Sequence, residues 1–517
     1  MTSFITTAIP FVNAAPHLGF AYELVLADIL ARHRRRRGDA VRFCTGTDDN
    51  SLKNVVAASA VGIPTRDFVA ANAAAFRALG PLLDLTPDDF VETSRDPRHR
   101  CAVEWLWRRC AASGDLYRRT WSGRYCAGCE AFLDDNVERC HEHDGVPEHI
   151  TEDNWFFRLS RYRDPIRNAI ASNHLRIVSE SARAETLAFL DGEVRDLSVS
   201  RAATRAQGWG IPVPDDPSQV IYVWFDALTN YLSSLGFGSS SSSLIETYWP
   251  DAHTPPRQQQ IHVIGKGIAR FHAVYWPAFL LSAGVPLPSK IAVHGYLTVD
   301  GRKISKSNNP APVPPIVERY GVDALRWHFA RRCRTRADSD VPRDSLGDAY
   351  DCDLADRLGN LVQRTSTLIA KLSSTDEPDL ARVPAPSETP QLATLRATAE
   401  TLPARVDAAL DAFLPDDAAA AIVELLDAAN RYLEQVAPWK LARTDPIGAL
   451  AALYAPLEAA RFAAGELAPF VPDVSRTIAE RLGDPDLAPT WGLLEPGAAL
   501  RLGAPPLPRK QPARNRA

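Results

Sequence analysis

The sequence contains very little methionine and lysine. Its 517 residues include one methionine and 8 lysines, against 50 arginines. A GC-rich coding bias explains both features, so neither indicates a function. No apolar run reaches the roughly 18 residues that a membrane span needs, and no signal-peptide pattern precedes the first apolar run. We therefore expect a cytoplasmic protein that does not associate with a membrane.

Cysteine content and charge exclude two other classes of protein. The 8 cysteines are spread over a long chain, unlike the dense cysteines of a secreted domain held by disulfides. The net charge of −5 argues against indiscriminate coating of nucleic acid, so any polynucleotide would be held by local basic patches. At 45% hydrophobic residues, the chain can bury a large core.

Alternating apolar strands and helices predict the fold of the first part of the chain. Strand-like runs at 4–11 and 41–45 are each followed by a helical pattern. This order is typical of an α/β domain in which helices wrap a Rossmann-type parallel sheet. The ligand crevice of such a domain lies at the carboxyl ends of its strands, which here are residues 8–16 and 46–50.

We expect five segments in all. They are 1–115, the first half of the α/β domain; 116–215, an insertion; 216–344, the second half; 345–482, an all-α helical bundle; and 483–517, a tail. Apolar strands at 220–225 and 261–264 are expected to resume the sheet after the insertion. The tail is rich in proline and arginine from Ala504, which predicts disorder towards its end. No extra folded module follows the bundle, which favours a monomer.

The segment 6–23 predicts a nucleotide-binding turn. Its apolar run breaks into a proline-punctuated turn, and a helix then begins at His17-Leu18-Gly19-Phe20. The start of a helix directs unpaired N–H groups and the positive end of its dipole at an anion. Gly19 lacks a Cβ, so a base or ribose can approach the backbone. The downstream loop GRKISKS is a second candidate phosphate site, with Lys303, Ser305, Lys306 and Ser307.

Two close pairs of soft metal ligands lie in the insertion. Their spacing is typical of a tetrahedral zinc site, and the ligands would be Cys126, Cys129, Cys140 and His143. His141 is an alternative fourth ligand, and free thiols on a loop are the alternative to any metal. Because all four ligands are protein side chains, the zinc would be structural.

Two stripes of aromatic and apolar side chains follow predicted strands at helical spacing. They are Trp224, Ala227, Leu228 and Tyr231 in one stripe, and Ile268, His272 and Trp276 in the other. Such stripes are more often plain core than a binding site. However, the polar tips of Trp, Tyr and His need partners, and their flat faces suit a thioether or an aliphatic side chain. Both interpretations remain open.

Asp48 follows Thr45-Gly46-Thr47 at the end of a predicted strand. Its carboxylate is therefore presented at the ligand edge of the sheet, where a substrate ammonium group would be a suitable partner. The alternative is that Asp48 caps the N-terminus of the following helix.

Nine motifs occur in order between Phe4 and about Pro472. They are AIPFVNAAPHLGF, TGTDD, WFFRLS, YVWFDAL, HVIGKG, FHAVYWPAFL, HGYLTVDGRKISKS, ERYGVDALRW and DLADRLGNLVQR. Together they resemble the methionyl-tRNA synthetase family of class I aminoacyl-tRNA synthetases. The resemblance implies that the chain activates L-methionine with ATP and transfers it to methionine tRNA.

The same resemblance implies a role for individual residues. His17 would bind the transition-state phosphate, Lys303 and Lys306 would bind the pyrophosphate, and Mg²⁺ would accompany ATP. The whole ATP site would contain His17, Gly19, Phe20, Lys303, Ser305, Lys306 and Ser307. The methionine pocket would contain Ile9, Phe11, Asp48, Trp224, Ala227, Leu228, Tyr231, Ile268, His272 and Trp276. The anticodon site would contain Asn360, Arg364 and Trp439, which can stack on and hydrogen-bond splayed bases.

Several residues depart from the family pattern. Phe20 replaces the second histidine of the HIGH-type motif and cannot donate a hydrogen bond to ATP, while Phe11 replaces a tyrosine of the pocket. Asn50 replaces a histidine, and Gly267 replaces an aspartate. Because most changes fall on the ATP side, two alternatives stay open: a specialised paralogue that makes an aminoacyl-adenylate for a biosynthetic or resistance role, and a catalytically weak tRNA-binding protein.

Overall fold

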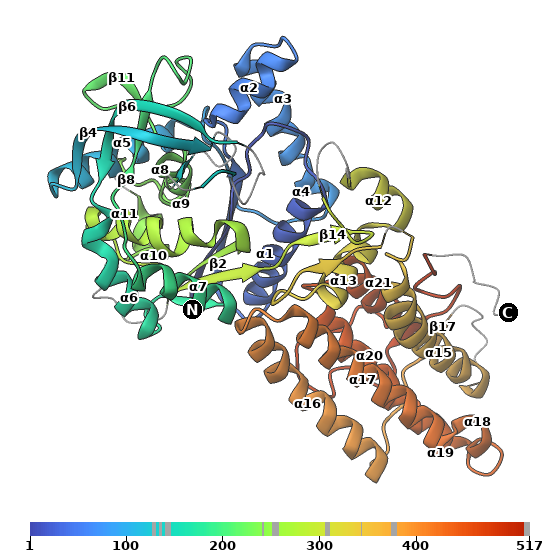
Figure 1. The fold of residues 1–517 in the computed structure, drawn as a ribbon. Coiled ribbons are helices and arrows are strands. Elements are labelled where there is room, and N and C mark those ends of the chain that lie inside the picture. The colour runs from blue at the N-terminus through green and yellow to red at the C-terminus, as the bar shows by residue number, and fades with distance from the viewer. Residues whose placement is uncertain are drawn as a thin grey trace. The chain divides into compact units, whose positions relative to one another are not determined.

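The chain folds into two compact units. A computed structural model describes residues 1–126, 131–133, 137–139, 146–239, 242–250, 258–304, 311–342, 344–373 and 380–510. The units are Met1–His294 and Gly295–Ala517, and each is described by itself (Figure 1).

A six-stranded parallel sheet forms the centre of the first unit. Its strands lie in the order β3 (Asp89–Glu92), β2 (Ala40–Thr47), β1 (Thr2–Thr7), β12 (Gln258–Gly265), β13 (Lys290–His294) and β7 (Arg176–Val178). The sheet confirms the predicted parallel α/β domain. The chain passes from β1 to β2 on one side and returns in β12 on the other, so the strand order reverses there. Ligands of such sheets bind beyond the carboxyl ends of the strands at this reversal.

Helices cover both faces of this sheet. Phe4 and Ile5 are adjacent in β1 and therefore point to opposite faces, and both are fully buried. Helix α1 (Leu18–Arg36) packs across β1, β2 and β12, whereas α5 (Pro97–Ala112) packs on α11 (Trp276–Ala283). Burial on both faces explains why two apolar residues, Phe4 and Ile5, are adjacent in β1 instead of alternating with exposed polar ones.

Residues 220–225 do not resume the parallel sheet, so that prediction is wrong. Strand β11 (Asp216–Ile221) instead pairs antiparallel with β9 (Ser200–Ala202) and β10 (Pro212–Val213). Helix α8 (Val223–Leu228) then begins two residues after β11 ends. A short apolar run suits a buried strand and a buried helix equally well, and here the run is divided between the two. Residues 261–264 do lie in the sheet, in β12.

Two long antiparallel strands dominate the expected insertion. Strands β4 (Leu116–Cys126) and β6 (Glu148–Phe157) pair along their length in a four-stranded sheet with β5 (Ala131–Leu133) and β8 (Leu197–Ser198). Strand β7 comes from the same part of the chain but pairs with β13 at the edge of the main sheet. The insertion is therefore joined to the α/β core by a strand.

The second unit is mainly helical beyond Asp351, which confirms the predicted helical region. Helices α16 (Pro390–Asp411) and α17 (Pro415–Val436) pack against each other and on α20 (Tyr454–Leu467) (Figure 1). In the described residues, the stretch Pro446–Leu467 is long and apolar enough to cross a membrane, and 72% of its most apolar window is buried inside the structure. This burial is that of a core helix.

The tail is ordered up to Lys510, although the sequence predicts disorder from Ala504. Arg509 pairs with both carboxylate oxygens of Asp356 at 2.6 and 2.7 Å. The Lys510 N–H donates to Asp351 at 2.7 Å. Composition does not reveal such partners, because they lie about 150 residues earlier in the chain. Residues 511–517 lie outside the described residues.

Candidate active site

The segment after β1 and the end of β2 meet at the carboxyl edge of the sheet. Phe11 and Asp48 form a parallel backbone bridge, and the Asp48 N–H donates to the Pro10 carbonyl at 2.9 Å. Ile9 lies two residues before this bridge. The pairing of β1 with β2 therefore brings together three residues that the sequence predicted to share a pocket.

Asp48 does not cap the following helix. The N-cap of α2 (Leu52–Ala60) is Ser51, whose hydroxyl oxygen accepts the Lys53 N–H at 3.1 Å. The capping alternative for Asp48 is therefore wrong. Asp48 is buried, and a carboxylate buried at a ligand edge is a candidate partner for a cation.

His17 is the N-cap of α1. Its Nδ1 accepts the Gly19 N–H at 3.1 Å, so in the neutral ring the proton resides on Nε2. The imidazole is thus held at the start of the helix with an N–H donor on its far nitrogen. The first N–H groups of α1 and this donor belong to one small region, which suits an anionic ligand.

Phe20 packs directly on His17. The two rings stack with centroids 4.2 Å apart and 25° between their planes, and the Phe76 ring meets Phe20 edge-on at 5.2 Å. The residue that replaces the usual second histidine therefore supplies no donor, but it restricts the orientation of the first histidine.

Tyr231 and His272 form a buried hydrogen-bonded pair. The Tyr231 hydroxyl lies 2.8 Å from His272 Nε2, and His272 Nδ1 lies 3.0 Å from the Ile268 carbonyl oxygen. A carbonyl only accepts, so Nδ1 carries the proton and Nε2 accepts the Tyr231 hydroxyl proton. Burial lowers the pKa of His272 to about 4, so the imidazole is neutral near pH 7. Three residues of the two predicted stripes are therefore connected.

His262 belongs to the same group of side chains, although the sequence did not identify it. Its ring stacks on Tyr231 with centroids 4.1 Å apart. The Trp276 indole N–H donates to its Nε2 at 3.2 Å, and its Nδ1 lies 2.7 Å from the Thr6 hydroxyl. Burial lowers the pKa of His262 well below its ordinary value. The only sequence signal was its position in HVIGKG, inside a strand that also reads as plain core.

Trp224 forms the partly exposed wall of this group. Its ring stacks on Phe271 with centroids 3.6 Å apart and an 8° tilt, and it meets Phe11 edge-on at 6.4 Å. Ala227 and Leu228, on the same helix α8, are buried. Phe271 is a second residue that the sequence did not identify, although it directly precedes His272.

Asp49 is a buried carboxylate that directly follows Asp48. Its side chain accepts the Ser94 hydroxyl at 2.8 Å, and burial raises its pKa to about 6. Its backbone carbonyl accepts the Trp209 indole N–H at 2.8 Å, which holds this turn in place.

The loop GRKISKS belongs to the second unit. Lys303 ends the short strand β15 (Arg302–Lys303), which pairs with β14 (Leu297–Val299). Ser305, Lys306 and Ser307 lie outside the described residues. Binding of ATP by this loop therefore remains a prediction.

The predicted anticodon residues lie on the helical unit. Asn360 begins α15 (Asn360–Ser373), Arg364 follows one turn later, and both are exposed. The Arg364 guanidinium lies 5.8 Å from the centroid of the Trp439 ring. Trp439 is 40% exposed, which is unusual for an indole and leaves part of it accessible to a base.

One predicted zinc ligand can be placed. Cys126 is buried at the end of β4, whereas Cys129, Cys140 and His143 lie outside the described residues. Within the described part of the chain, no group of three or more His, Cys, Asp or Glu side chains is arranged to hold a metal ion.

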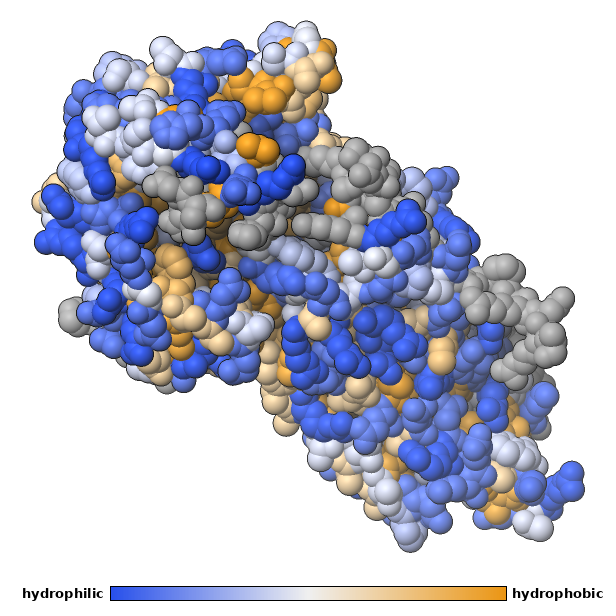
Figure 2. Space-filling view, in the orientation of Figure 1, coloured by the Kyte–Doolittle hydropathy of each residue, from blue (hydrophilic) through white to orange (hydrophobic). Residues whose placement is uncertain are grey.

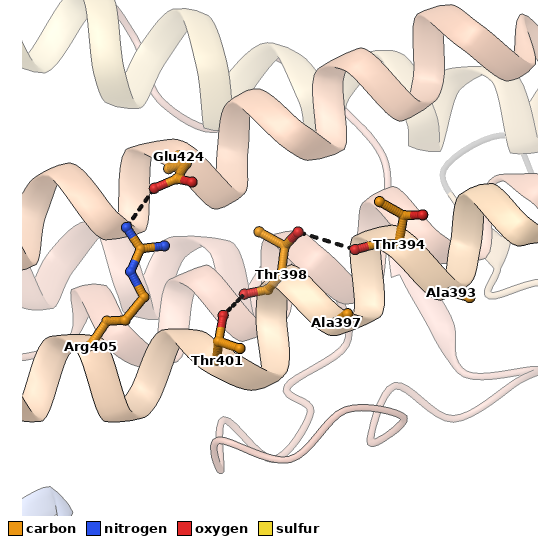
Figure 3. Close-up of a pocket in the computed structure, with 7 residues that line it drawn as sticks. All are labelled: Ala393, Thr394, Ala397, Thr398, Thr401, Arg405 and Glu424. Atoms are coloured by element: carbon orange, nitrogen blue, oxygen red, sulfur yellow. Dashed lines mark hydrogen bonds and ion pairs between the residues drawn. The ribbon is translucent and has the colours of Figure 1, made fainter.

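Two surface features contain none of the predicted site residues. A groove of about 620 Å³ runs along α16, but its threonine hydroxyls bond to their own helix and its Arg405 pairs with Glu424 (Figure 3). Apolar side chains gather over α2 and α3 (Thr65–Arg77) in Figure 2, where Val56, Val61 and Ile63 are exposed.

Two families match the chain. The family described as "tRNA synthetases class I (M)" matches residues 3–144 and 136–366. The family described as "Anticodon binding domain of methionyl tRNA ligase" matches residues 383–501.

Curated relatives and solved structures match nearly the whole chain. The chain is 38% identical to a methionine–tRNA ligase of Mycobacterium bovis over 98% of both chains, and 36% identical to one of Brucella melitensis over 93% and 92%. Mycobacterium tuberculosis methionyl-tRNA synthetase in complex with methionyl-adenylate is 37% identical with a TM-score of 0.90, over 98% of this chain and 100% of that one. The free-state structure has a TM-score of 0.84 at 35% identity, over 99% of each chain.

The sheet reversal, the capped start of α1 and the aromatic group around Tyr231 agree with these matches. The chain belongs to the methionyl-tRNA synthetase family of class I aminoacyl-tRNA synthetases.

Proposed function

We propose that this protein is a methionine–tRNA ligase, which activates L-methionine with ATP and transfers the methionyl group to methionine tRNA. The observation that carries the proposal is the aromatic group at the sheet reversal, in which two imidazoles accept hydrogen bonds from Tyr231 and Trp276 and burial lowers the pKa of both. Similarity over nearly the full length to a synthetase solved with methionyl-adenylate supports it.

The pocket suits an uncharged thioether. Trp224 and Tyr231 offer flat apolar faces, and sulfur packs favourably against aromatic rings. The neutral His272 adds polarity without charge. Asp48, at the same edge, would bind the substrate ammonium group. The full pocket would also include Ile9, Phe11, Ala227, Leu228, Ile268 and Trp276.

The activation step places developing charge near the start of α1. A carboxylate oxygen of methionine attacks the α-phosphorus of ATP, the bond to the bridging oxygen breaks, and pyrophosphate leaves with its electron pair. The His17 Nε2 proton and the first N–H groups of α1 would stabilise the negative charge that develops. Lys303 and Lys306 would bind the pyrophosphate, with Gly19, Phe20, Ser305 and Ser307 completing the ATP site. Mg²⁺ would enter with ATP as part of the substrate.

The helical unit would recognise the tRNA. Asn360, Arg364 and Trp439 offer an amide, a guanidinium and an accessible indole, which can hydrogen-bond and stack on unpaired bases. We expect the protein to act as a cytoplasmic monomer. The departures at Phe20, Asn50 and Gly267 are the reason to test activation separately from tRNA charging.

We expect methionine-dependent ATP/pyrophosphate exchange, followed by charging of methionine tRNA. The purified protein is assayed for exchange with a panel of amino acids and then for charging. Exchange without charging would indicate the specialised paralogue. No exchange with any amino acid would indicate the tRNA-binding protein.

Tyr231→Phe should raise KM for methionine about tenfold, because it leaves the buried His272 Nε2 without its donor. KM for ATP should change little. The control is Tyr117→Phe, which also removes a hydroxyl that donates to a side chain, here Asp196 at 2.8 Å, but in the insertion. Equal changes in both variants would contradict the pocket assignment.

Phe20→His should raise the rate of activation in the exchange assay. The variant keeps a flat ring to stack on His17 and adds a donor, and a preorganised donor to developing charge can contribute on the order of 3 kcal/mol. Phe20→Leu, which removes the stack and adds no donor, should lower the rate. A rate that is unchanged or lower in Phe20→His would show that the site has compensated for the missing histidine.

We infer a structural zinc site in the insertion, held by Cys126, Cys129, Cys140 and His143. The support is the ligand spacing, together with the burial of the Cys126 thiol at the end of β4. Cys126→Ala should lose bound zinc, measured by elemental analysis, and make β4 more susceptible to proteolysis. Cys101→Ala, at an exposed cysteine, is the control. Full zinc retention in Cys126→Ala would contradict the ligand set.

A further inference from the structure

A buried polar cluster links the segment that carries Asp48 to the helix that carries Trp224. It consists of Asn50, His99, Asp226 and Ser233. Asn50 lies between β2 and α2, His99 near the start of α5, Asp226 in α8 and Ser233 at the end of α9 (Asn230–Ser233). All except Asn50 are fully buried, and Asn50 is partly buried.

Asp226 accepts a hydrogen bond on each carboxylate oxygen. Asn50 Nδ2 donates to Oδ2 at 2.8 Å, and His99 Nε2 lies 2.5 Å from Oδ1. His99 Nδ1 lies 2.9 Å from the Ser233 hydroxyl, which also lies 2.9 Å from the Thr229 carbonyl. A carboxylate without such partners would be costly to bury, so this cluster fixes α8 against α5.

Asn50 extends the cluster to the edge of the sheet. Its second amide proton faces the Thr93 carbonyl at 3.4 Å, while its first bonds Asp226. Asn50 is two residues from Asp48, and Asp226 is two residues from Trp224 and adjacent to Ala227. The hydrogen bond from Asn50 to Asp226 therefore joins two parts of the proposed methionine site. One is the segment that carries Asp48, and the other is helix α8, which carries Trp224.

We propose that Asn50 is a positioning residue for methionine. Its hydrogen bond to Asp226 fixes the distance between Asp48, which would bind the ammonium group, and Trp224, which would contact the thioether. One bound methionine would span that distance. This inference rests on the proposed function. It also gives a role to a residue that departs from the family pattern, because an asparagine N–H and a histidine N–H can both donate to Asp226.

The decisive variant is Asn50→Asp, which keeps the size of the side chain but replaces both N–H donors with oxygen. Two carboxylates would then face each other, so the two segments should separate. We expect KM for methionine in ATP/pyrophosphate exchange to rise at least about tenfold, with KM for ATP changed by less than about twofold. A role in folding alone would not separate the two KM values.

Two rescue variants test the mechanism. In the double variant Asn50→Asp/Asp226→Asn, the donor and acceptor are exchanged, and the new amide oxygen can still accept from His99. The single variant Asn50→His restores an N–H at position 50. Both should bring KM for methionine back to within about threefold of the unaltered protein. Asn430→Asp is the matched control, because its amide is also partly buried and donates twice, but in the helical unit.

The outcomes separate this inference from the proposed function. An unchanged KM for methionine in Asn50→Asp, a parallel rise in both KM values, or no recovery in the double variant would overturn the inference. Absence of methionine-dependent exchange in the unaltered protein would instead overturn the proposed function. Thermal melting monitors folding. If Asn50→Asp does not fold, Asn50→Ala is measured in its place. Its KM for methionine should rise in the same way, and an unchanged KM for methionine would overturn the inference.

Discussion

The reversal of strand order between β1 and β12 is the constraint on which the site depends. Because β1 lies between β2 and β12, the residues that follow these three strands must meet at one edge. Residues near 10, 48 and 266 are distant in the chain, yet the backbone bridge from Phe11 to Asp48 brings the first two into contact. The helical turns that carry Ile268 and His272 begin at Lys266, directly after β12 ends, so they are presented at the same edge.

The direction of the hydrogen bonds determines the tautomers of His262 and His272 at this edge of the sheet. The carbonyl of Ile268 can only accept, and the indole of Trp276 can only donate, so each fixes the tautomer of a neighbouring histidine. Tyr231 connects the two rings, since it donates to His272 and stacks on His262. Burial keeps both imidazoles uncharged. Four side chains, none of which carries a charge at neutral pH, therefore form a buried group whose hydrogen bonds have a defined direction.

The sequence predicted the parallel sheet and the helical second unit from local periodicity, and its motifs predicted three residues that lie in contact, Tyr231, Ile268 and His272. It failed for residues whose role depends on partners that are distant in the sequence. From the sequence, His262 is indistinguishable from a core residue of a strand. Its hydrogen bonds to Thr6 and Trp276 are visible only in the structure. The local sequence allowed Asp48 to be a helix cap, but in the structure Ser51 is the N-cap of α2. Residues 220–225 are divided between a strand and a helix, and the spacing of Ile268, His272 and Trp276 spans 3₁₀ and π turns rather than one α-helix.

The orientation of the Tyr231 and Trp276 protons has a further consequence for what the proposed pocket admits. Both protons are already directed at imidazole nitrogens, so neither is available to a guest without breaking an existing bond. A thioether makes no demand for a strong donor, whereas a sulfoxide oxygen does. To gain either of these donors, a sulfoxide oxygen would have to displace an existing hydrogen bond, whereas a thioether would leave both in place.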